Sequence, residues 1–282
     1  RLGQALTVPA GVTLCGEGLA TRLVWRGPGP ALVVRGDAPG GVRRLAVMAW
    51  DAAPDAVGIE VTRAAATVVI EHVDVEGMPA AGVRVADSNG LVTISQCRVR
   101  QCGTGYDFRR VDRVNVVESM ALESHGDGIA IRDGSGSVVI DSAIVWCQRG
   151  CGVRIMNAAP GTVRLEGCVI SSSGENGVAV IDSAGVKIHG NVIHNSSLAG
   201  IGRFAGVALR GATRQAEIVG NRIGDELFDP HQLTAVEESD GAAANVVQYN
   251  VLCPNNWPQT GTLDRVVVAR GAGSVNGPNV LQ

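Results

Sequence analysis

The feature of this sequence that most limits its fold is a short repeat, Gly-apolar-x-apolar, which recurs along most of the chain. Its copies begin at Gly58, Gly82, Gly105, Gly128, Gly152, Gly177 and Gly206, and weaker copies begin at Ala31 and Ala235. Successive starts are 23 to 25 residues apart between Gly58 and Gly177, and 29 residues apart in the last two intervals. A period of this size predicts a solenoid, in which each repeat is one coil that packs on its neighbours.

Two further apolar stretches follow the tetrapeptide within each repeat. The second is centred on residues such as Ile70, Ile94 and Ile140, and the third begins three residues later. Gly, Asp, Asn and Ser lie at the corners between the stretches, and no 3.6-residue helical pattern interrupts them. We therefore predict an all-β fold, a parallel β-helix solenoid of about nine coils with three short strands per coil and alternate side chains pointing inward.

This pattern resembles the right-handed parallel β-helix of the pectate-lyase-like superfamily. The column that ends in Asn191, Asn221 and Asn250 is similar to the asparagine ladder of that family, in which stacked amides bond along the helix axis. The right-handed sense also agrees with the general preference of crossovers between parallel strands. We expect a single domain over 1–282, with a cap and first coil in 1–30, regular coils in 31–255 and a C-terminal cap segment in 256–282.

Composition excludes several classes of protein. The net charge is −3, from 24 Lys+Arg against 27 Asp+Glu, so the chain lacks the basic footprint of a nucleic-acid-binding protein. No apolar run reaches the roughly 18 residues that a membrane helix needs. Lys187 is the only lysine and lies outside a G-x-x-x-x-G-K-[ST] loop, which excludes that phosphate-binding motif.

The sequence does not decide the cellular compartment of the protein. The seven cysteines include no C-x-x-C pair, and we interpret most of them as small core residues. The first residues show no signal peptide, and the odd cysteine number is compatible with a cytoplasmic protein. The family resemblance instead favours an extracellular or periplasmic one. Nothing in the sequence indicates the oligomeric state.

The outward positions of the tetrapeptide strands carry a row of charged residues. The predicted substrate-binding residues on this row are Arg84, Arg109, Arg132, Arg154, Arg210 and Glu237. Between them, Ala130, Ala179 and Ala208 are expected to leave a low floor. Because guanidinium groups bind carboxylates in a bidentate manner, the row predicts a groove for an anionic ligand. The alternative is a ladder of cross-strand ion pairs, Glu60–Arg84–Asp107, that only stabilises the sheet.

Four residues are candidates for catalysis: His125, Asp127, Asp107 and His231. His125 and Asp127 lie in the turn before a groove strand, where the histidine would carry a proton and the carboxylate would orient it or act as the base. A solvated polar turn is the alternative there, and Cys151, a conceivable partner of His125, is expected to pack in a corner. His231 lies in the second of two insertions, 196–205 and 224–234, which we expect to wall the site.

Two shorter resemblances bear on the chemistry. Asp229-Pro230-His231 resembles the catalytic motif of mannuronan C5-epimerases, although it precedes a groove strand and is followed by Gln232 instead of an acid. The segment from His125 to Ile131 is similar to the Asp-Asp-Cys-Ile-Ala-Ile region of polygalacturonases, but Gly126 replaces an Asp. Inverting hydrolysis needs two carboxylates, so we place it below lyase or epimerase chemistry.

The leading hypothesis is therefore an enzyme that acts on an anionic, uronate-type saccharide by abstracting the C5 proton, as a lyase or epimerase. Arginines would neutralise the uronate carboxylate, and His125 or His231 would take the proton. Lyases of this fold commonly use Ca²⁺, but the sequence shows no compact carboxylate cluster, so we predict no metal or other cofactor. The alternatives are a non-catalytic β-helix, such as a surface, phage-fibre or NosD-like repeat protein, and an enzyme that modifies an anionic small molecule.

Overall fold

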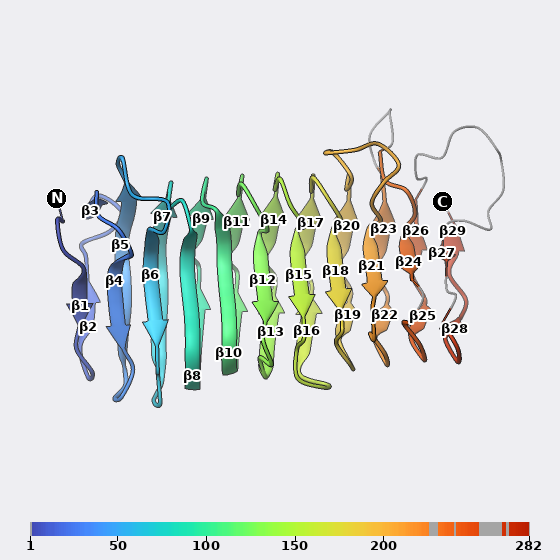
Figure 1. Cartoon of the computed structure of the whole chain (residues 1–282), viewed down its shortest axis with the longest axis horizontal. Helices are drawn as coiled ribbons and strands as arrows, with labels where there is room; N and C mark the ends of the chain where they lie inside the picture. Colours follow the sequence, from blue (N-terminus) through green and yellow to red (C-terminus); the bar gives the residue numbers. More distant parts are fainter. Residues whose placement is uncertain (1, 226–230, 240, 254–266, 269–270, 282) are drawn as a thin grey trace.

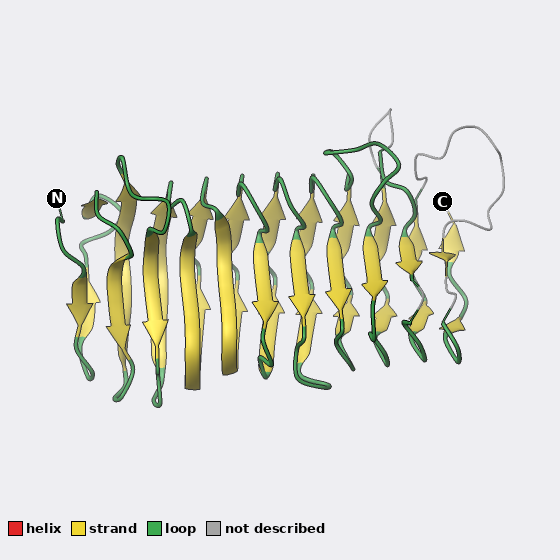
Figure 2. Cartoon of the chain, in the orientation of Figure 1, coloured by secondary structure: helices red, strands yellow, loops and turns green. Residues whose placement is uncertain are grey.

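The chain folds into an elongated parallel β-solenoid (Figure 1). The computed structural model describes residues 2–225, 231–239, 241–253, 267–268 and 271–281. Within these ranges every regular element is a β-strand (Figure 2), which confirms the all-β, parallel prediction. No helix among these residues is long and apolar enough to cross a membrane. Three columns of strands, one for each side of the coil, run along the solenoid axis.

The first column contains the tetrapeptide strands, each paired in parallel with the next. Its strands are β1 Leu6–Val8, β4 Pro30–Arg35, β6 Val57–Thr62, β8 Ala81–Ser95, β10 Thr104–Val117, β12 Ile129–Arg132, β15 Val153–Met156, β18 Val178–Ile181, β21 Val207–Arg210, β24 Val236–Glu238 and β27 Val267–Val268. The coil number differs slightly from the predicted nine, and strands pair before Ala31 and after Cys253 as well as between them.

The second and third columns complete each coil. Strands that belong to the second column are β2 Thr13–Cys15, β5 Gly40–Ala49, β7 Val68–Glu76, β13 Ser137–Asp141, β16 Val163–Glu166, β19 Lys187–His189, β22 Glu217–Val219, β25 Val246–Gln248 and β28 Val275–Asn276. Those of the third column are β3 Arg22–Trp25, β9 Arg98–Arg100, β11 Met120–Leu122, β14 Ile144–Trp146, β17 Val169–Ser171, β20 Val192–His194, β23 Arg222–Gly224, β26 Val251–Leu252 and β29 Val280–Leu281. The early coils merge two strands into one, since β5 and β7 continue into the third column while β8 and β10 continue into the second.

The core is a narrow apolar interior along the axis. Alternation along each strand turns the two apolar residues of the tetrapeptide inward, and pairs such as Ile59 with Val61 and Ile129 with Ile131 are completely buried. The central residues of the second column are buried in the same way. Burial at about 25 cal/mol per Å² of apolar surface, repeated in every coil, is the main stabilising contribution.

Glycine begins each repeat because the corner that enters the first column has no room for a side chain. A Cβ atom at Gly177 would lie 2.5 Å from Ile193 Cγ2 and 2.7 Å from the carbonyl oxygen of Gly206. The corner between the second and third columns instead needs a single residue in the left-handed conformation. Gln96 and Gly190 occupy it with φ values of 53° and 64°.

Asparagine amides are stacked along the axis beside this second corner. Asn191 Nδ2 donates to Asn221 Oδ1 at 3.0 Å, Asn221 Nδ2 donates to Asn250 Oδ1 at 3.0 Å, and Asn250 continues to Asn279. The same oxygens accept backbone N–H groups of the preceding coil, for example that of Cys168. Each buried amide therefore satisfies backbone groups that the corner would otherwise leave unpaired.

The two insertions lie against each other at one edge of the solenoid. Gly202 N donates to His231 O at 2.7 Å, and Leu233 N donates to Phe204 O at 2.7 Å. These bonds join the segment 196–205 to the described end of the second insertion. Residues 226–230, which include Asp229, and most of the expected cap segment 256–282 lie outside the described residues.

Candidate functional site

The predicted charged row is present on the outward side of the first column. Strand pairing places Glu60, Arg84 and Asp107 side by side on β6, β8 and β10. The same register continues through Ala130 and Arg154 to Ala179, Ala208 and Glu237. A second row two residues further along each strand contains Arg109 opposite Arg132 and, several coils later, Arg210.

Asp107 is the centre of a tight ionic cluster. Its side chain is only 1% exposed, although it points outward, because long arginine stems cover it. Arg84 Nε donates to Oδ2 at 3.1 Å, and Arg109 reaches the same oxygen with Nη2 at 2.6 Å. Arg132 Nε lies 3.3 Å from Oδ1. The hydrogen bond that Arg109 donates to Asp107 raises the pKa of Arg109, which keeps this guanidinium charged.

The three guanidinium groups do not contact Asp107 equally closely. Arg84 is shared with Glu60, whose Oε1 lies 3.8 Å from Arg84 Nη1. Arg132 makes the loosest contact, since its Nε forms no hydrogen bond of good geometry with any residue that the structure describes. Arg109 and Arg132 are also about a third and a quarter exposed. Three cations thus converge on one buried anion, and the side chains of Arg109 and Arg132 remain partly open to solvent.

A second cluster surrounds Arg154 on β15. Arg154 donates to both oxygens of Asp127, from Nε at 2.8 Å and from Nη2 at 3.0 Å, and Nη2 also reaches Glu175 Oε2 at 2.9 Å. The Asp127 hydrogen bonds raise the pKa of Arg154. Asp127 Oδ1 additionally accepts the backbone N–H of Cys151 at 3.0 Å. This cluster is the reverse of the first, with two anions around one cation.

One detail of the sequence interpretation needs correction. Ala130, Ala179 and Ala208 face outward in register but are at most 1% exposed, so they form no open floor.

The candidate residues fall into two separate groups. His125 is exposed in the turn between β11 and β12, beside the two ionic clusters in sequence. His231 precedes β24, four coils further along, which is about 19 Å at about 4.8 Å per coil. Arg210 and Glu237 belong to this distant group and form an ion pair at 3.7 Å. His125 and His231 therefore cannot act on the same saccharide bond.

Glu175 and Cys151 both contact the second cluster, Glu175 through Arg154 and Cys151 through its backbone N–H. Sequence analysis missed Glu175, although its place two residues before the repeat glycine Gly177 puts it at the edge of the first column. Cys151 is fully buried, as expected of a corner residue, and burial raises the pKa of its thiol to about 12. A Cys151–His125 nucleophilic pair is thereby disfavoured, since the thiolate is the reactive form. Across the described ranges no three His, Cys, Asp or Glu residues are grouped to hold a metal ion.

Comparisons with known proteins identify the family. Residues 57–223 match the family described as the right-handed β-helix region. The chain belongs to this family. No curated protein sequence matches it.

Several solved structures are similar in fold. The A-module of mannuronan C-5 epimerase AlgE6 from Azotobacter vinelandii superposes with a TM-score of 0.70 and 17% identity, covering 98% of this chain and 85% of that one. The AlgE4 A-module from the same organism gives 0.63 and 17%, covering 98% and 83%. Tailspike protein 2 of the Escherichia coli O157:H7 bacteriophage CAB120 gives 0.68 and 12%, covering 83% of this chain and 36% of the tailspike. At these identities the likeness shows a shared right-handed β-helix fold.

Proposed function

We propose that this β-helix binds an anionic, uronate-type saccharide across the first column and abstracts its C5 proton, as a lyase or an epimerase. The observation that carries the proposal is the convergence of Arg84, Arg109 and Arg132 on the single buried carboxylate of Asp107. Such a cluster presents fixed, partly exposed guanidinium groups with an excess of positive charge. Similarity in fold to two mannuronan C-5 epimerase modules supports the same class of ligand.

In this proposal Arg109 and Arg132 bind the uronate carboxylate. Both side chains are partly exposed to solvent, and Arg132 has the weakest attachment to Asp107. Neutralising the carboxylate makes the neighbouring C5–H more acidic, because the negative charge that develops on proton removal spreads onto that group. Asp107 is buried beneath its arginines, so we assign it to holding them in place and not to proton transfer.

His125 is the proposed base. It is exposed and lies two residues before Asp127 of the second cluster, and imidazole changes charge near neutral pH. Asp127 is a poor candidate for this step, because both of its oxygens are engaged by Arg154 and one also by Cys151 N. We assign Asp127 to holding Arg154. His231, about 19 Å away along the axis, would contact a different sugar ring of an oligomer.

The test is to incubate the protein with oligomers of mannuronate, guluronate and galacturonate, and with a neutral oligomer of matched length. A lyase yields a C4–C5 double bond conjugated to the carboxylate, seen by ultraviolet absorbance. An epimerase incorporates solvent deuterium at C5, seen by NMR. His125→Ala should lower kcat by about 10²-fold or more with a smaller change in KM. Arg132→Gln should lower kcat/KM for acidic substrates.

The matched control is Arg164→Gln, which removes an exposed arginine from β16 in the second column. It should leave turnover unchanged. Turnover of neutral and acidic oligomers at equal rates, or full activity of both His125→Ala and Arg132→Gln, would contradict the proposed site.

A saccharide-binding β-helix without turnover is the second candidate function. One observation favours it: the two outward rows of the described first column, from β4 to β24, contain no aromatic residue. Ligand pockets are usually lined by apolar and aromatic side chains around a few polar groups. Binding of acidic oligomers with neither double-bond formation nor deuterium incorporation would select this candidate.

A further inference from the structure

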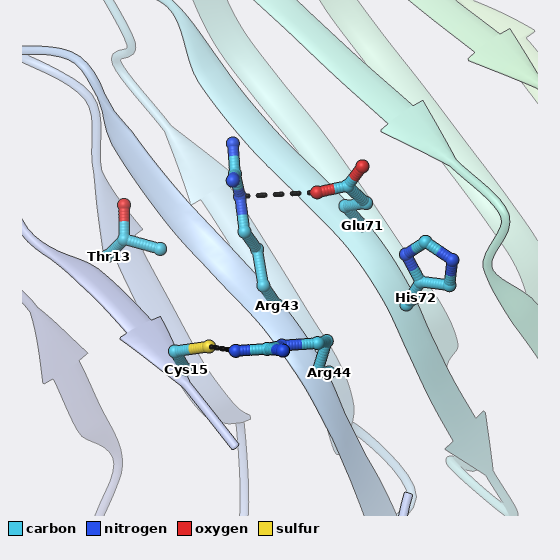
Figure 3. A pocket seen from close by; sticks show the side chains of 6 residues that line it. All are labelled: Thr13, Cys15, Arg43, Arg44, Glu71 and His72. Carbon is cyan, nitrogen blue, oxygen red and sulfur yellow. Dashed lines mark hydrogen bonds and ion pairs between the residues drawn. The ribbon is translucent and has the colours of Figure 1, made fainter. Parts of the chain in front are cut away.

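A surface pocket of about 490 Å³ lies on the second column near the N-terminal end, on a different side of the coil from the ionic clusters of the first column. Figure 3 shows its lining side chains, which are Thr13, Cys15, Arg43, Arg44, Glu71 and His72. They come from three successive strands, β2, β5 and β7, and strand pairing places Cys15 beside Arg43 and Arg43 beside Glu71. The pocket thus joins a free thiol to two arginines, one glutamate and one histidine.

Backbone geometry explains why these groups meet. Arg44 and His72 occupy the left-handed corner position between the second and third columns, with φ values of 52° and 51°. The same corner carries Gln96, Glu118 and Ser142 in the next coils, so a cation at this position is particular to the first coils. Cys15 is the last residue of β2, and the Arg44 side chain extends across the corner toward it (Figure 3).

The Cys15 sulfur accepts a hydrogen bond from an arginine in this pocket. Arg44 Nη2 donates to Cys15 Sγ at 3.2 Å, and the pKa of Arg44 is raised by this hydrogen bond. Arg43 Nε lies 3.4 Å from Glu71 Oε2, so that arginine and glutamate offset each other's charge. Arg44 is left as the cation directed at the thiol. A guanidinium that donates to sulfur stabilises the anionic form, which is the nucleophile.

We propose that this pocket is a thiol modification site, in which Cys15 reacts with a small anionic disulfide such as oxidised glutathione. The Cys15 sulfur attacks one sulfur of the disulfide, so that a new S–S bond joins the protein to one half of the reagent. The original S–S bond breaks, and the other half leaves as a thiolate that takes up the proton lost from Cys15. The protein thiol is oxidised and the leaving half is reduced, with no further oxidant needed. Arg44 attracts the carboxylates of the reagent.

Cys147 provides an internal control. It is the other exposed free cysteine, and its backbone N–H donates to Ser171 O. Within the described chain no guanidinium donates to its sulfur. Both thiols can be followed in one sample by peptide mass mapping after acid quenching. The remaining described cysteines are buried, and burial raises the pKa of Cys97, Cys102 and Cys168 above the ordinary thiol value, so they should react slowly.

The experiment compares the rates of mixed-disulfide formation with oxidised glutathione at low salt. In the wild-type protein Cys15 should react at least about threefold faster than Cys147, because the Arg44 guanidinium donates to the Cys15 sulfur and attracts the anionic reagent, which no guanidinium does at Cys147 within the described chain. Arg44→Gln should remove this advantage and leave the Cys147 rate unchanged. With the cationic disulfide cystamine the advantage of Cys15 should shrink, because Arg44 repels it.

Arg43→Gln is the matched control for the sulfur contact, because it removes a guanidinium from the same strand that pairs with Glu71. With neutral iodoacetamide it should leave the Cys15 rate unchanged, whereas Arg44→Gln should lower it. Equal rates at Cys15 and Cys147 with oxidised glutathione, or a Cys15 rate that Arg44→Gln does not change, would overturn the proposal. So would rapid alkylation of Cys15 without any mixed disulfide.

Discussion

Asp107→Asn tests the central ionic cluster most severely, because it keeps the shape of the side chain and removes its charge. In the native protein the carboxylate is 1% exposed and is contacted by Arg84, Arg109 and Arg132 within 3.3 Å. The asparagine amide would place N–H groups against guanidinium donors, so at least one side of the cluster loses its acceptor. Arg109 and Arg132 would then lose the carboxylate that they share, while Arg84 would keep only the more distant Glu60.

The expected cost follows from burial. Removing one partner of a buried ion pair costs about 3–5 kcal/mol, and the lower end applies here because the three guanidinium groups keep part of their hydration. A loss of about 3 kcal/mol lowers Tm by roughly 6–12 °C for a chain of this size. Glu60→Gln is the matched control, since that carboxylate is 25% exposed and 3.8 Å from Arg84, and it should cost under about 1 kcal/mol.

The assay is thermal unfolding followed by circular dichroism, in chloride and then with added sulfate or malonate at equal ionic strength. Divalent anions should raise the Tm of Asp107→Asn more than that of the wild-type protein, because they bind the arginines that have lost the Asp107 carboxylate in the folded state. Equal Tm values for Asp107→Asn and Glu60→Gln would refute the reasoning. So would a sulfate effect no larger in Asp107→Asn than in the wild type.

Three further predictions concern the solenoid. Asn221→Leu should lower stability by about 2–6 kcal/mol in thermal unfolding without changing saccharide affinity, since it unpairs the N–H of Asn191 and the C=O of Ile188 at about 1–3 kcal/mol each. Unchanged melting with lost affinity would contradict this. Gly177→Ala should lower stability more than Gly190→Ala in the same assay, because a Cβ at position 177 would lie 2.5 Å from Ile193 Cγ2. A Cβ at position 190 meets no atom within 4 Å and adds only about 1–2 kcal/mol of strain from the left-handed backbone conformation. The reverse order of stabilities would contradict the account of the two corners. Stability should fall as pH rises above 9, because the unfolded chain then releases thiol protons that the folded chain retains on Cys102 and Cys151, whose pKa is raised to about 12. Cys151→Ala should reduce the slope of the unfolding free energy against pH by up to about 1.4 kcal/mol per pH unit. An unchanged slope would contradict the assignment.

Periodicity made the coils predictable because a β-helix repeats one local geometry. The tetrapeptide identifies the strand, its two apolar residues point inward, and the residue between them points outward. The row through Arg84, Asp107 and Arg154 therefore follows from the repeat spacing. The Asn191–Asn221–Asn250 column followed from the same register. Merging of short strands into β8 and β10 was not predictable, because it depends on whether a corner keeps strand geometry.

Side-chain arrangement was harder to foresee, because long arginine side chains reach across two coils. Counting placed Asp107 beside Arg84 but gave no reason to expect Arg109 and Arg132 on the same carboxylate. The repeat spacing also suggested Asp127 as a base, although the Asp127 carboxylate is paired with Arg154. It missed Glu175 because that residue lies in a turn and not on a strand. The insertions were located by their length, while their mutual hydrogen bonds needed three-dimensional contacts.

The most direct measurement is the affinity of one acidic oligosaccharide and of its carboxyl-reduced, neutral counterpart, determined by titration calorimetry for the wild-type protein and Arg132→Gln. The acidic form should bind the wild type more tightly by about 1.5–3 kcal/mol, the range for hydrogen bonds to charged groups. Arg132→Gln should remove most of that difference while leaving the neutral affinity unchanged. Equal affinity of the two saccharides for the wild type, or an undiminished preference in Arg132→Gln, would contradict the assignment of this arginine cluster to carboxylate recognition.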